Sequence, residues 1–274
     1  WMKWIDWLKS WFFVLIVAIG CVMWQHNIFA IVVSTLLFLP VYMAHAGTPM
    51  TDRVAVEAKV RAEVSKDLAL PYKLDEALVD RQCLDGRAVK DVQGHLVEYW
   101  VNLECGYCGV REPLQAQRAA PDMCIVVRHR PSDQYGESLK KALSYEALKK
   151  FSANAANLFW DKVLPKAALG LPVPYEASLM LAFQEAAIPA EAFGEVLSKD
   201  AAGIINEDIL AGLGRITSTP TYILAGIRFP SCDFTAVQLG EALGIAKKAR
   251  EGDKAALEAV ISIITKGQLN EKML

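Results

Sequence analysis

Hydrophobic residues are distributed unevenly along the chain, and they separate an apolar leader from a longer part of mixed composition. Residues 1–46 include 34 apolar residues and three charged ones, and the stretch 10–51 carries no charge. As one α-helix that stretch would be about 63 Å long, roughly twice the hydrocarbon core of a bilayer. We therefore expect breaks at residues 25–27 (Gln-His-Asn) and at Pro40, which leave two apolar runs that are each short for a full crossing.

Three interpretations of residues 1–46 remain open. A transmembrane anchor is favoured by the uncharged runs and by Trp4, Trp7 and Trp11, which suit a membrane interface. A cleavable signal segment is favoured by residues 44–46 (Ala-His-Ala), an A-x-A pattern that follows an apolar run. A pair of buried core helices is the alternative to both. Either membrane interpretation places the remainder of the chain at or across a membrane.

The remainder begins with helical and strand-type patterns in an order typical of an α/β fold. Residues 51–69 place apolar side chains at helical spacing among alternating charges, which predicts an exposed amphipathic helix. The segment 73–94 is polar and rich in turn residues. Strands are predicted over 95–103 and 123–128, which are rich in β-branched and aromatic residues, and a helix is predicted over 108–119 between them.

A long helical block separates this β-α-β unit from a second unit. The Ala-rich pattern over 132–213, interrupted by prolines, predicts about four helices. A β-hairpin is predicted where two strand-type runs flank Gly226, and two further helices follow over 233–250 and 253–266. The predicted fold class is therefore α/β, with one sandwich interrupted by a helical insertion.

Composition and charge exclude several classes of function. With 29 basic and 31 acidic residues the formal net charge is −2, so no cationic surface of the kind that binds nucleic acid is expected. The hydrophobic content of 53% excludes a mainly disordered chain. These averages point to no particular chemistry, and the six cysteines are the most informative residues.

The sequence Cys105-Gly106-Tyr107-Cys108 carries the clearest chemistry. It lies where a predicted strand gives way to a predicted helix, and its two thiols can close a small disulfide. A helix N-terminus favours the thiolate of the first cysteine, and a stabilised thiolate is both the nucleophile and the leaving group of disulfide exchange. We expect Cys105 to attack the substrate and Cys108 to resolve the mixed disulfide.

The surroundings of this motif resemble the thioredoxin superfamily over roughly residues 86–250. The run Leu-Val-Glu-Tyr-Trp over 96–100 looks like the strand that bears the buried acid of that family. The resemblance implies that Glu98 exchanges a proton with Cys108. Pro113, five residues after Cys108, matches the proline that kinks the active-site helix of the family.

The resemblance extends to the start of the predicted hairpin. Thr219-Pro220 matches the cis-proline loop that lies against the active-site disulfide in this superfamily. It implies that Thr219 and Pro220 bind the substrate, with Thr219 in contact with the substrate cysteine. Gly106 and Tyr107 are expected to support the active site, and Tyr107 to tune its redox potential.

Within the superfamily, the helical insertion resembles the DsbA/DsbC-type periplasmic thiol–disulfide enzymes. The dipeptide Gly106-Tyr107 and the threonine before Pro220 look most like the DsbC/DsbG disulfide isomerases, whereas the insertion looks more like the DsbA oxidases. Residues 47–85 depart from the isomerases, because they predict a helix and a loop rather than a dimerisation domain of strands. One additional residue separates Glu98 from the motif compared with the thioredoxin pattern. The direction of the exchange reaction stays open.

The remaining cysteines allow more than one arrangement. Cys83 and Cys232 lie in turn-like contexts and can form a second, structural disulfide, with independent reduced thiols as the alternative. Cys124 lies in an apolar strand, where a small buried hydrophobe is its expected state. A structural zinc site would need two more ligands at comparable spacing, and the chain has no second CxxC, so no metal is expected.

The predicted organisation is a transmembrane or signal segment (1–46), a helical or loop extension (47–85) and a thioredoxin-like domain (86–274) with its insertion at about 132–213. The resemblance implies an exported thiol–disulfide oxidoreductase that forms or isomerises disulfides in cysteine-containing proteins. It implies no cofactor beyond the redox-active pair, and it implies a membrane redox partner. The expected location is the bacterial cell envelope, with the soluble domain in the periplasm, anchored or released after cleavage.

Two other functions remain open. A membrane-anchored assembly factor of an envelope secretion or conjugation system would use the fold only for binding, and its motif cysteines would then be dispensable. A metal-binding protein or metallochaperone would carry zinc or copper. The intact pair of cysteines in the motif favours the enzyme.

Overall fold

The computed structural model describes residues 50–71, 78–92, 95–132, 136–164 and 173–272. The chain divides into two compact units, Trp1–Asp52 and Arg53–Leu274. The expectations for the apolar leader, residues 1–46, lie outside the described residues. Among the helices that are described, none is both long enough and apolar enough to span a bilayer.

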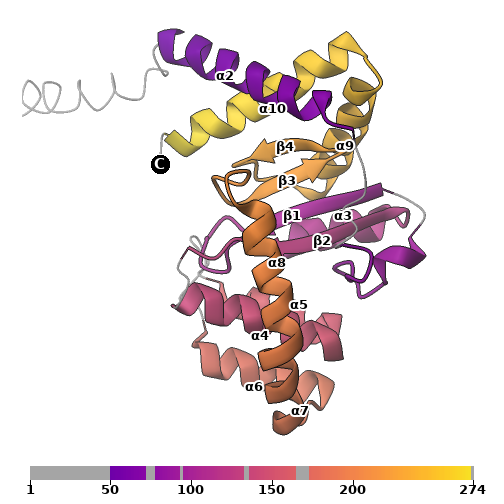
Figure 1. Ribbon diagram of the computed structural model, residues 1–274, viewed down its shortest axis with the longest axis vertical. Helices are drawn as coiled ribbons and strands as arrows, with labels where there is room; N and C mark the ends of the chain where they lie inside the picture. Colours follow the sequence, from indigo (N-terminus) through magenta and orange to yellow (C-terminus); the bar gives the residue numbers. More distant parts are fainter. Residues whose placement is uncertain (1–49, 72–77, 93–94, 133–135, 165–172, 273–274) are drawn as a thin grey trace, which may run out of the picture. The chain divides into compact units, whose positions relative to one another are not determined.

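A four-stranded sheet forms the centre of the second unit (Figure 1). Its strands are β1 (His95–Val101), β2 (Met123–His129), β3 (Thr221–Leu224) and β4 (Ile227–Pro230), in the order β2-β1-β3-β4. The pair β1 and β2 is parallel and is joined by the α-helical crossover that parallel strands need, whereas β1 with β3 and β3 with β4 are antiparallel. This arrangement confirms the predicted β-α-β unit and hairpin.

The hairpin between β3 and β4 has the tightest connection in the sheet. Leu224 pairs with Ile227, so only Ala225 and Gly226 form the loop. Both have positive φ, 48° and 79°, which is the combination of a type I′ turn. This turn fits the right-handed twist of the strands and sets the register of the two strands that follow the proline loop.

Helix α3 (Arg111–Ala119) follows β1 and packs beside α9 (Ala236–Arg250). The prediction of a helix from Cys108 was wrong by three residues, because α3 begins only at Arg111. Pro113 gives the physical reason. It has no N–H to donate, so it fits the first turn of a helix, whereas a helix that began at Cys108 would lose an internal hydrogen bond there.

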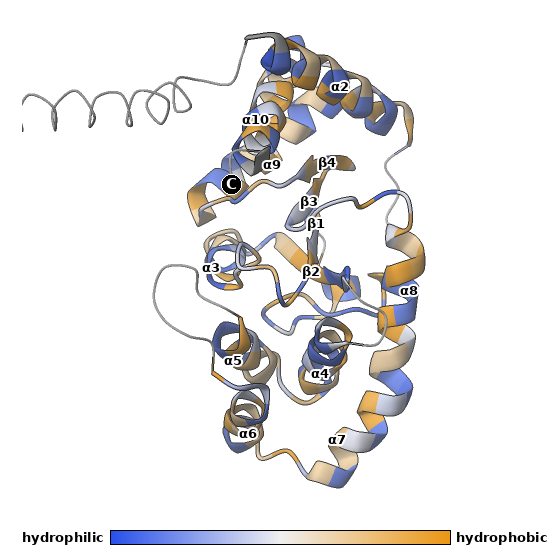
Figure 2. Ribbon diagram, turned by 90° about the vertical axis from the view of Figure 1, so that its left-hand side faces the viewer, coloured by the Kyte–Doolittle hydropathy of each residue, from blue (hydrophilic) through white to orange (hydrophobic). Residues whose placement is uncertain are grey.

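The predicted helical insertion is confirmed between β2 and β3. It consists of α4 (Glu137–Phe151), α5 (Ala153–Val163), α6 (Tyr175–Ala186), α7 (Ala190–Val196), the π-helical segment η3 (Leu197–Ala201) and α8 (Ala202–Gly212). Helix α8 runs back to the sheet and lies on the side of the strands opposite α3 (Figure 2). Gly212 permits this close approach, because a Cβ at that position would lie 2.8 Å from Cζ3 of Trp100.

Two helices outside the β-α-β and β-β-α units pack together at the β4 side of the sheet. Helix α2 (Met50–Ala69) confirms the amphipathic helix predicted over 51–69, and α10 (Lys254–Lys272) extends beyond its predicted end. Arg61 of α2 donates hydrogen bonds to Glu258 of α10 at 2.6 and 2.7 Å. Asp67 of α2 accepts from the side chain and backbone of Arg228 in β4.

Candidate active site

The cysteine motif forms a tight turn in the loop between β1 and α3. The N–H of Cys105 donates to the carbonyl of Asn102, and the N–H of Cys108 donates to the carbonyl of Cys105, both at 2.9 Å. The two cysteines are not bonded to each other, so the motif is in its dithiol state. Cys105 is partly exposed, whereas Cys108 is fully buried. The turn therefore presents one thiol to the surface and holds the other beneath it.

The two thiols differ strongly in acidity. The Cys108 thiol donates a hydrogen bond to Cys105 and, with the backbone N–H groups of Tyr107 and Cys108, lowers the pKa of Cys105 to about 6 against the cost of its partial burial. Burial raises the pKa of Cys108 far above its ordinary value, and the neighbouring Cys105 thiolate raises it further. At neutral pH the motif therefore holds a thiolate at Cys105 and a thiol at Cys108. These local donors replace the helix terminus that we expected to stabilise Cys105.

The loop before β3 lies against Cys105. The Thr219–Pro220 peptide bond is cis, and the Cys105 Sγ lies 3.3 Å from the Thr219 carbonyl oxygen. The structure thus brings together residues that are 114 positions apart in the sequence. The strand order, the cysteine turn at the end of β1 and the cis-proline loop opposite it make the fold thioredoxin-like.

Glu98 is not part of this cluster, contrary to the role implied by the resemblance. Its carboxylate accepts hydrogen bonds from Trp100 Nε1 at 3.2 Å and from Arg128 at 3.3 Å. Arg128 in turn pairs with buried Asp208 of α8, on the side of the sheet away from α3. Side chains alternate between the two faces of a strand, so the additional residue between Glu98 and the motif turns Glu98 to the opposite face.

Tyr99 occupies the position in β1 that faces the cysteine turn. Its hydroxyl donates to the carbonyl of Gly109, the residue after Cys108, at 3.0 Å. Its ring stacks on Tyr222 of β3 with 4.4 Å between centroids, and on Trp160 of α5 at 5.9 Å. The sequence interpretation missed this residue, although the one-residue offset of Glu98 was a signal that its neighbour takes the place facing the motif.

The other predicted site residues lie around the motif with different surroundings. Gly106 and Tyr107 form the turn, and the Tyr107 side chain is 49% exposed. Pro113 is buried in the first turn of α3, a position that favours helix initiation rather than the expected kink. Glu104, which precedes the motif, pairs with Lys141 of α4 at 3.2 Å. The insertion therefore contributes a counter-charge beside the nucleophile.

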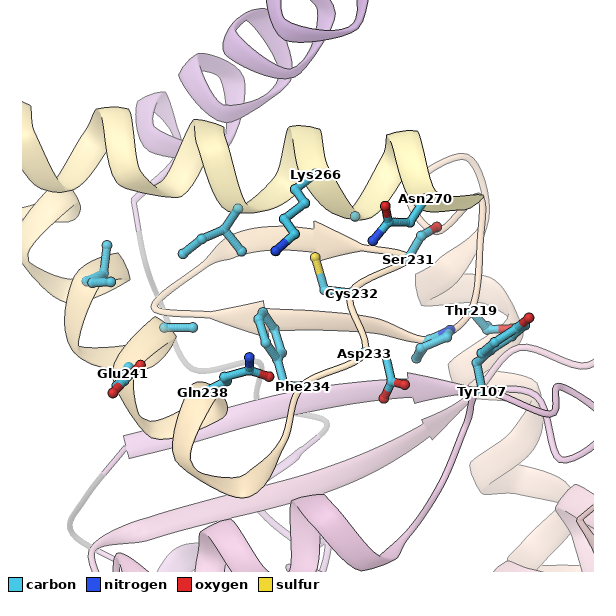
Figure 3. Close-up of a pocket in the computed structure, with 15 residues that line it drawn as sticks. Tyr107, Thr219, Ser231, Cys232, Asp233, Phe234, Gln238, Glu241, Lys266 and Asn270 are labelled. Atoms are coloured by element: carbon cyan, nitrogen blue, oxygen red, sulfur yellow. The ribbon is translucent and has the colours of Figure 1, made fainter. Parts of the chain in front are cut away.

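A cavity of about 660 Å³ adjoins the motif (Figure 3). Tyr107, Thr219 and Pro220 line one end of it. Helices α9 and α10 and the β4–α9 loop form the rest of its wall, and Figure 3 shows Lys266 extending from α10 toward Cys232. The cavity is the size of a small-molecule or short-peptide site, and it opens beside the reactive thiol.

The second pair of cysteines is not the expected one. Cys83 forms a disulfide with Cys124 at the start of β2, and both are buried. Both arrangements left open for Cys83, a disulfide with Cys232 or a reduced thiol, and the expected free Cys124 were therefore wrong. Cys232 remains a free, buried thiol on the cavity wall, where burial raises its pKa to about 12. Among the described residues, no group of three or more His, Cys, Asp or Glu side chains is placed to hold a metal ion.

A hydrogen-bonded loop surrounds this disulfide. The N–H of Leu84 donates to the carbonyl of Ile125, and Asn157 of α5 donates to the carbonyl of Leu84 at 2.8 Å. Arg81, two residues before Cys83, reaches Asp208 at 2.8 Å. The disulfide thus holds a segment with little regular structure, an isolated bridge between Gln82 and Ala88 and the short 3-10 helix η2 (Val89–Asp91), against β2 and the insertion.

Comparisons with known proteins concern the fold. No protein-family model and no curated protein matches the sequence. Among solved structures, the chain is similar to a thioredoxin-like oxidoreductase from Silicibacter pomeroyi, with 18% identity, a TM-score of 0.45, and coverage of 57% of this chain and 88% of that one. ScsC from Proteus mirabilis has 18% identity and a TM-score of 0.45, with coverage of 82% and 96%. DsbG from Mycobacterium tuberculosis, a disulfide bond oxidoreductase in its reduced form, has 19% identity and a TM-score of 0.39, with coverage of 62% and 85%.

Proposed function

We propose that this protein is a thiol–disulfide oxidoreductase that acts on cysteine-containing protein substrates through Cys105 and Cys108. One observation carries the proposal. Cys105 is a partly exposed thiol with a pKa lowered to about 6, and it lies against a cis-proline loop while its partner Cys108 is buried behind it. A stabilised, accessible thiolate next to a resolving thiol is the arrangement that disulfide exchange requires.

The reaction proceeds in two steps. The Cys105 thiolate attacks one sulfur of a substrate disulfide, forms a mixed disulfide and releases the other substrate sulfur as a thiolate. Cys108 then loses its proton and attacks the Cys105 sulfur, which releases the substrate and leaves the Cys105–Cys108 disulfide. The reverse sequence oxidises a substrate dithiol. The protein's own atoms carry both electrons, so no separate cofactor is required in either direction.

We assign substrate binding to Thr219, Pro220 and the adjoining cavity. The Thr219 carbonyl is within 3.3 Å of the Cys105 sulfur, so a polypeptide that follows this loop would bring its own cysteine to the nucleophile. Tyr107 is half exposed at the same end of the cavity. Tyr107 and Thr219 thus lie between the thiol and the cavity. The cavity would hold the substrate residues on one side of its cysteine.

Export of the catalytic domain is part of the same proposal. The Cys83–Cys124 disulfide supports it, because structural disulfides persist in oxidising compartments and are rare in the cytosol. In this view residues 1–46 act as an anchor or signal segment, and the domain works in the periplasm of a bacterial envelope. A membrane redox partner would then restore the oxidation state of Cys105 and Cys108 after each turnover.

The test is an exchange assay with two matched cysteine variants. Cys105→Ser should abolish both insulin reduction and the refolding of a scrambled multi-disulfide protein. Cys232→Ser removes the free thiol of the described residues that lies outside the motif, and this variant should retain both activities because that sulfur is buried and takes no part in the exchange. Activity that survives Cys105→Ser would overturn the proposal, and full cellular function without either motif cysteine would favour a binding role instead.

A further inference from the structure

The side of the sheet that faces the cysteine turn presents a tyrosine to Cys108. Tyr99 and Tyr222 are 1% and 2% exposed, and Cys108 is completely buried with them in one core. The Tyr99 hydroxyl is already committed as a donor to the Gly109 carbonyl. Burial raises the pKa of Tyr99 well above its ordinary value, as do Tyr222 and Cys108. A tyrosine in this state does not accept a proton at physiological pH.

The Cys105 thiolate, which accepts the hydrogen bond of the Cys108 thiol in the dithiol state, is consumed during the reaction. Once Cys105 is bonded to a substrate sulfur, it is no longer an anion. Glu98 lies on the other face of the sheet, in contact with Arg128. Tyr99 therefore faces the resolving thiol at the stage when a proton acceptor is needed.

We propose that Tyr99 is a positioning residue that denies Cys108 a buried proton acceptor, so that the mixed disulfide on Cys105 is long-lived and the enzyme works as a disulfide isomerase. This inference rests on the proposed function and assigns its direction. Tyr99 acts by filling the buried position beneath the turn with a side chain that does not accept a proton, and it does not touch the substrate.

The two fates of the mixed disulfide differ in their electron balance. If Cys108 attacks Cys105, the substrate leaves as a thiolate with its disulfide reduced, and the enzyme is oxidised by the same two electrons. If a second substrate thiolate attacks the substrate sulfur of the mixed disulfide, a new substrate disulfide forms and Cys105 leaves as the thiolate. This second route changes no oxidation state. Slow attack by Cys108 gives a second substrate thiolate time to attack the mixed disulfide.

Other ionisable groups surround this core and bear on its proton transfer. Cys105 lies above it, Tyr222 lies beside it on β3, and Asp233 and Cys232 approach from the β4–α9 loop. Burial, together with Glu112 of α3, raises the pKa of Asp233, although its side chain is largely exposed. We expect none of these groups to accept the proton of Cys108, so its deprotonation depends on hydroxide.

The experiment follows the resolution of a preformed mixed disulfide in the full chain. Cys105 is loaded with thionitrobenzoate in a Cys232→Ser background, and release of the coloured thiol reports the attack by Cys108. For unaltered Tyr99, the release rate should rise about tenfold per pH unit without a plateau below about pH 9. Tyr99→Glu should raise the rate at neutral pH by about tenfold or more and produce a plateau, as a general base does. The matched variant Tyr99→Phe adds no acceptor and should keep the unaltered pH profile.

Two results would overturn the inference. One is a plateau below about pH 9 with Tyr99 in place, since it would reveal an internal base for Cys108. The other is a folded Tyr99→Glu protein that resolves the mixed disulfide no faster than Tyr99→Phe. The pH profile needs no substitution at Tyr99, so it decides the question even if Tyr99→Glu fails to fold. Failure of the proposed function is a separate outcome, because Cys105 would then not accept the label or exchange it with a protein substrate.

Discussion

Two pairs of cysteines in this domain show how position alone separates reactive sulfur from structural sulfur. Cys105 and Cys108 lie in a turn at the end of β1, where one thiol is partly exposed and backbone N–H groups stabilise its thiolate. Cys83 and Cys124 are completely or almost completely buried beside β2 and are joined as a disulfide. Exchange chemistry needs access and a stabilised thiolate, and only the first pair has both.

The largest effect that would sharpen this comparison is on stability. The Cys83–Cys124 disulfide joins residues 41 positions apart, for which the chain-entropy model gives about 4 kcal/mol. The double variant Cys83→Ala/Cys124→Ala should therefore lose about that much free energy of unfolding in a denaturant titration. Cys232→Ala, which removes a buried thiol without opening a covalent loop, should cost about 1 kcal/mol. Equal losses in the two proteins would contradict a structural role for the disulfide.

The second effect concerns the acidity of the motif. The Cys105 pKa is lowered to about 6, so its thiolate fraction falls as pH drops below that value. Alkylation of Cys105 should slow about fiftyfold between pH 6 and pH 4 and change little between pH 7 and pH 8, because the thiolate is the reactive form. Mass spectrometry of each cysteine peptide measures these rates.

Cys232 is the internal reference for this titration. Burial raises its pKa to about 12, so it should stay almost unlabelled over the whole range. A Cys105 labelling rate that rises only above about pH 8, as for an ordinary thiol, would contradict the lowered pKa of Cys105, which sets the reactive pair apart from the structural one.

The smallest expected effect is at Glu98. Its carboxylate contacts Trp100 and Arg128 on the face of the sheet away from the motif. Glu98→Gln keeps the shape and a hydrogen-bond acceptor, and it should change the rate of exchange and its pH profile by less than about twofold. A large change in the high-pH limb of that profile, with the fold intact by circular dichroism, would restore Glu98 as the proton acceptor.

The sequence predicted the order of strands and helices, because apolar alternation and turn residues mark them locally. The family resemblance also implied that the Thr219–Pro220 loop lies against the cysteine motif, and the structure places the Thr219 carbonyl oxygen 3.3 Å from the Cys105 sulfur. The face of β1 on which Glu98 lies was harder to predict. It depends on the number of residues between Glu98 and the motif, because side chains alternate between the two faces of a strand. The Cys83–Cys124 pairing depends on a segment without periodic pattern that docks against a distant strand. The pairing leaves no local signal, whereas the face of Glu98 left one in its one-residue offset from the motif.

Capture of a substrate on Cys105 tests the central claim most directly. In Cys108→Ser the resolving thiol is absent, so attack on a protein disulfide should stop at the mixed disulfide. Incubation of this variant with an unfolded disulfide-containing protein should yield a covalent adduct that a reductant reverses, with peptide mapping to Cys105. No adduct, or an adduct confined to Cys232, would contradict the account.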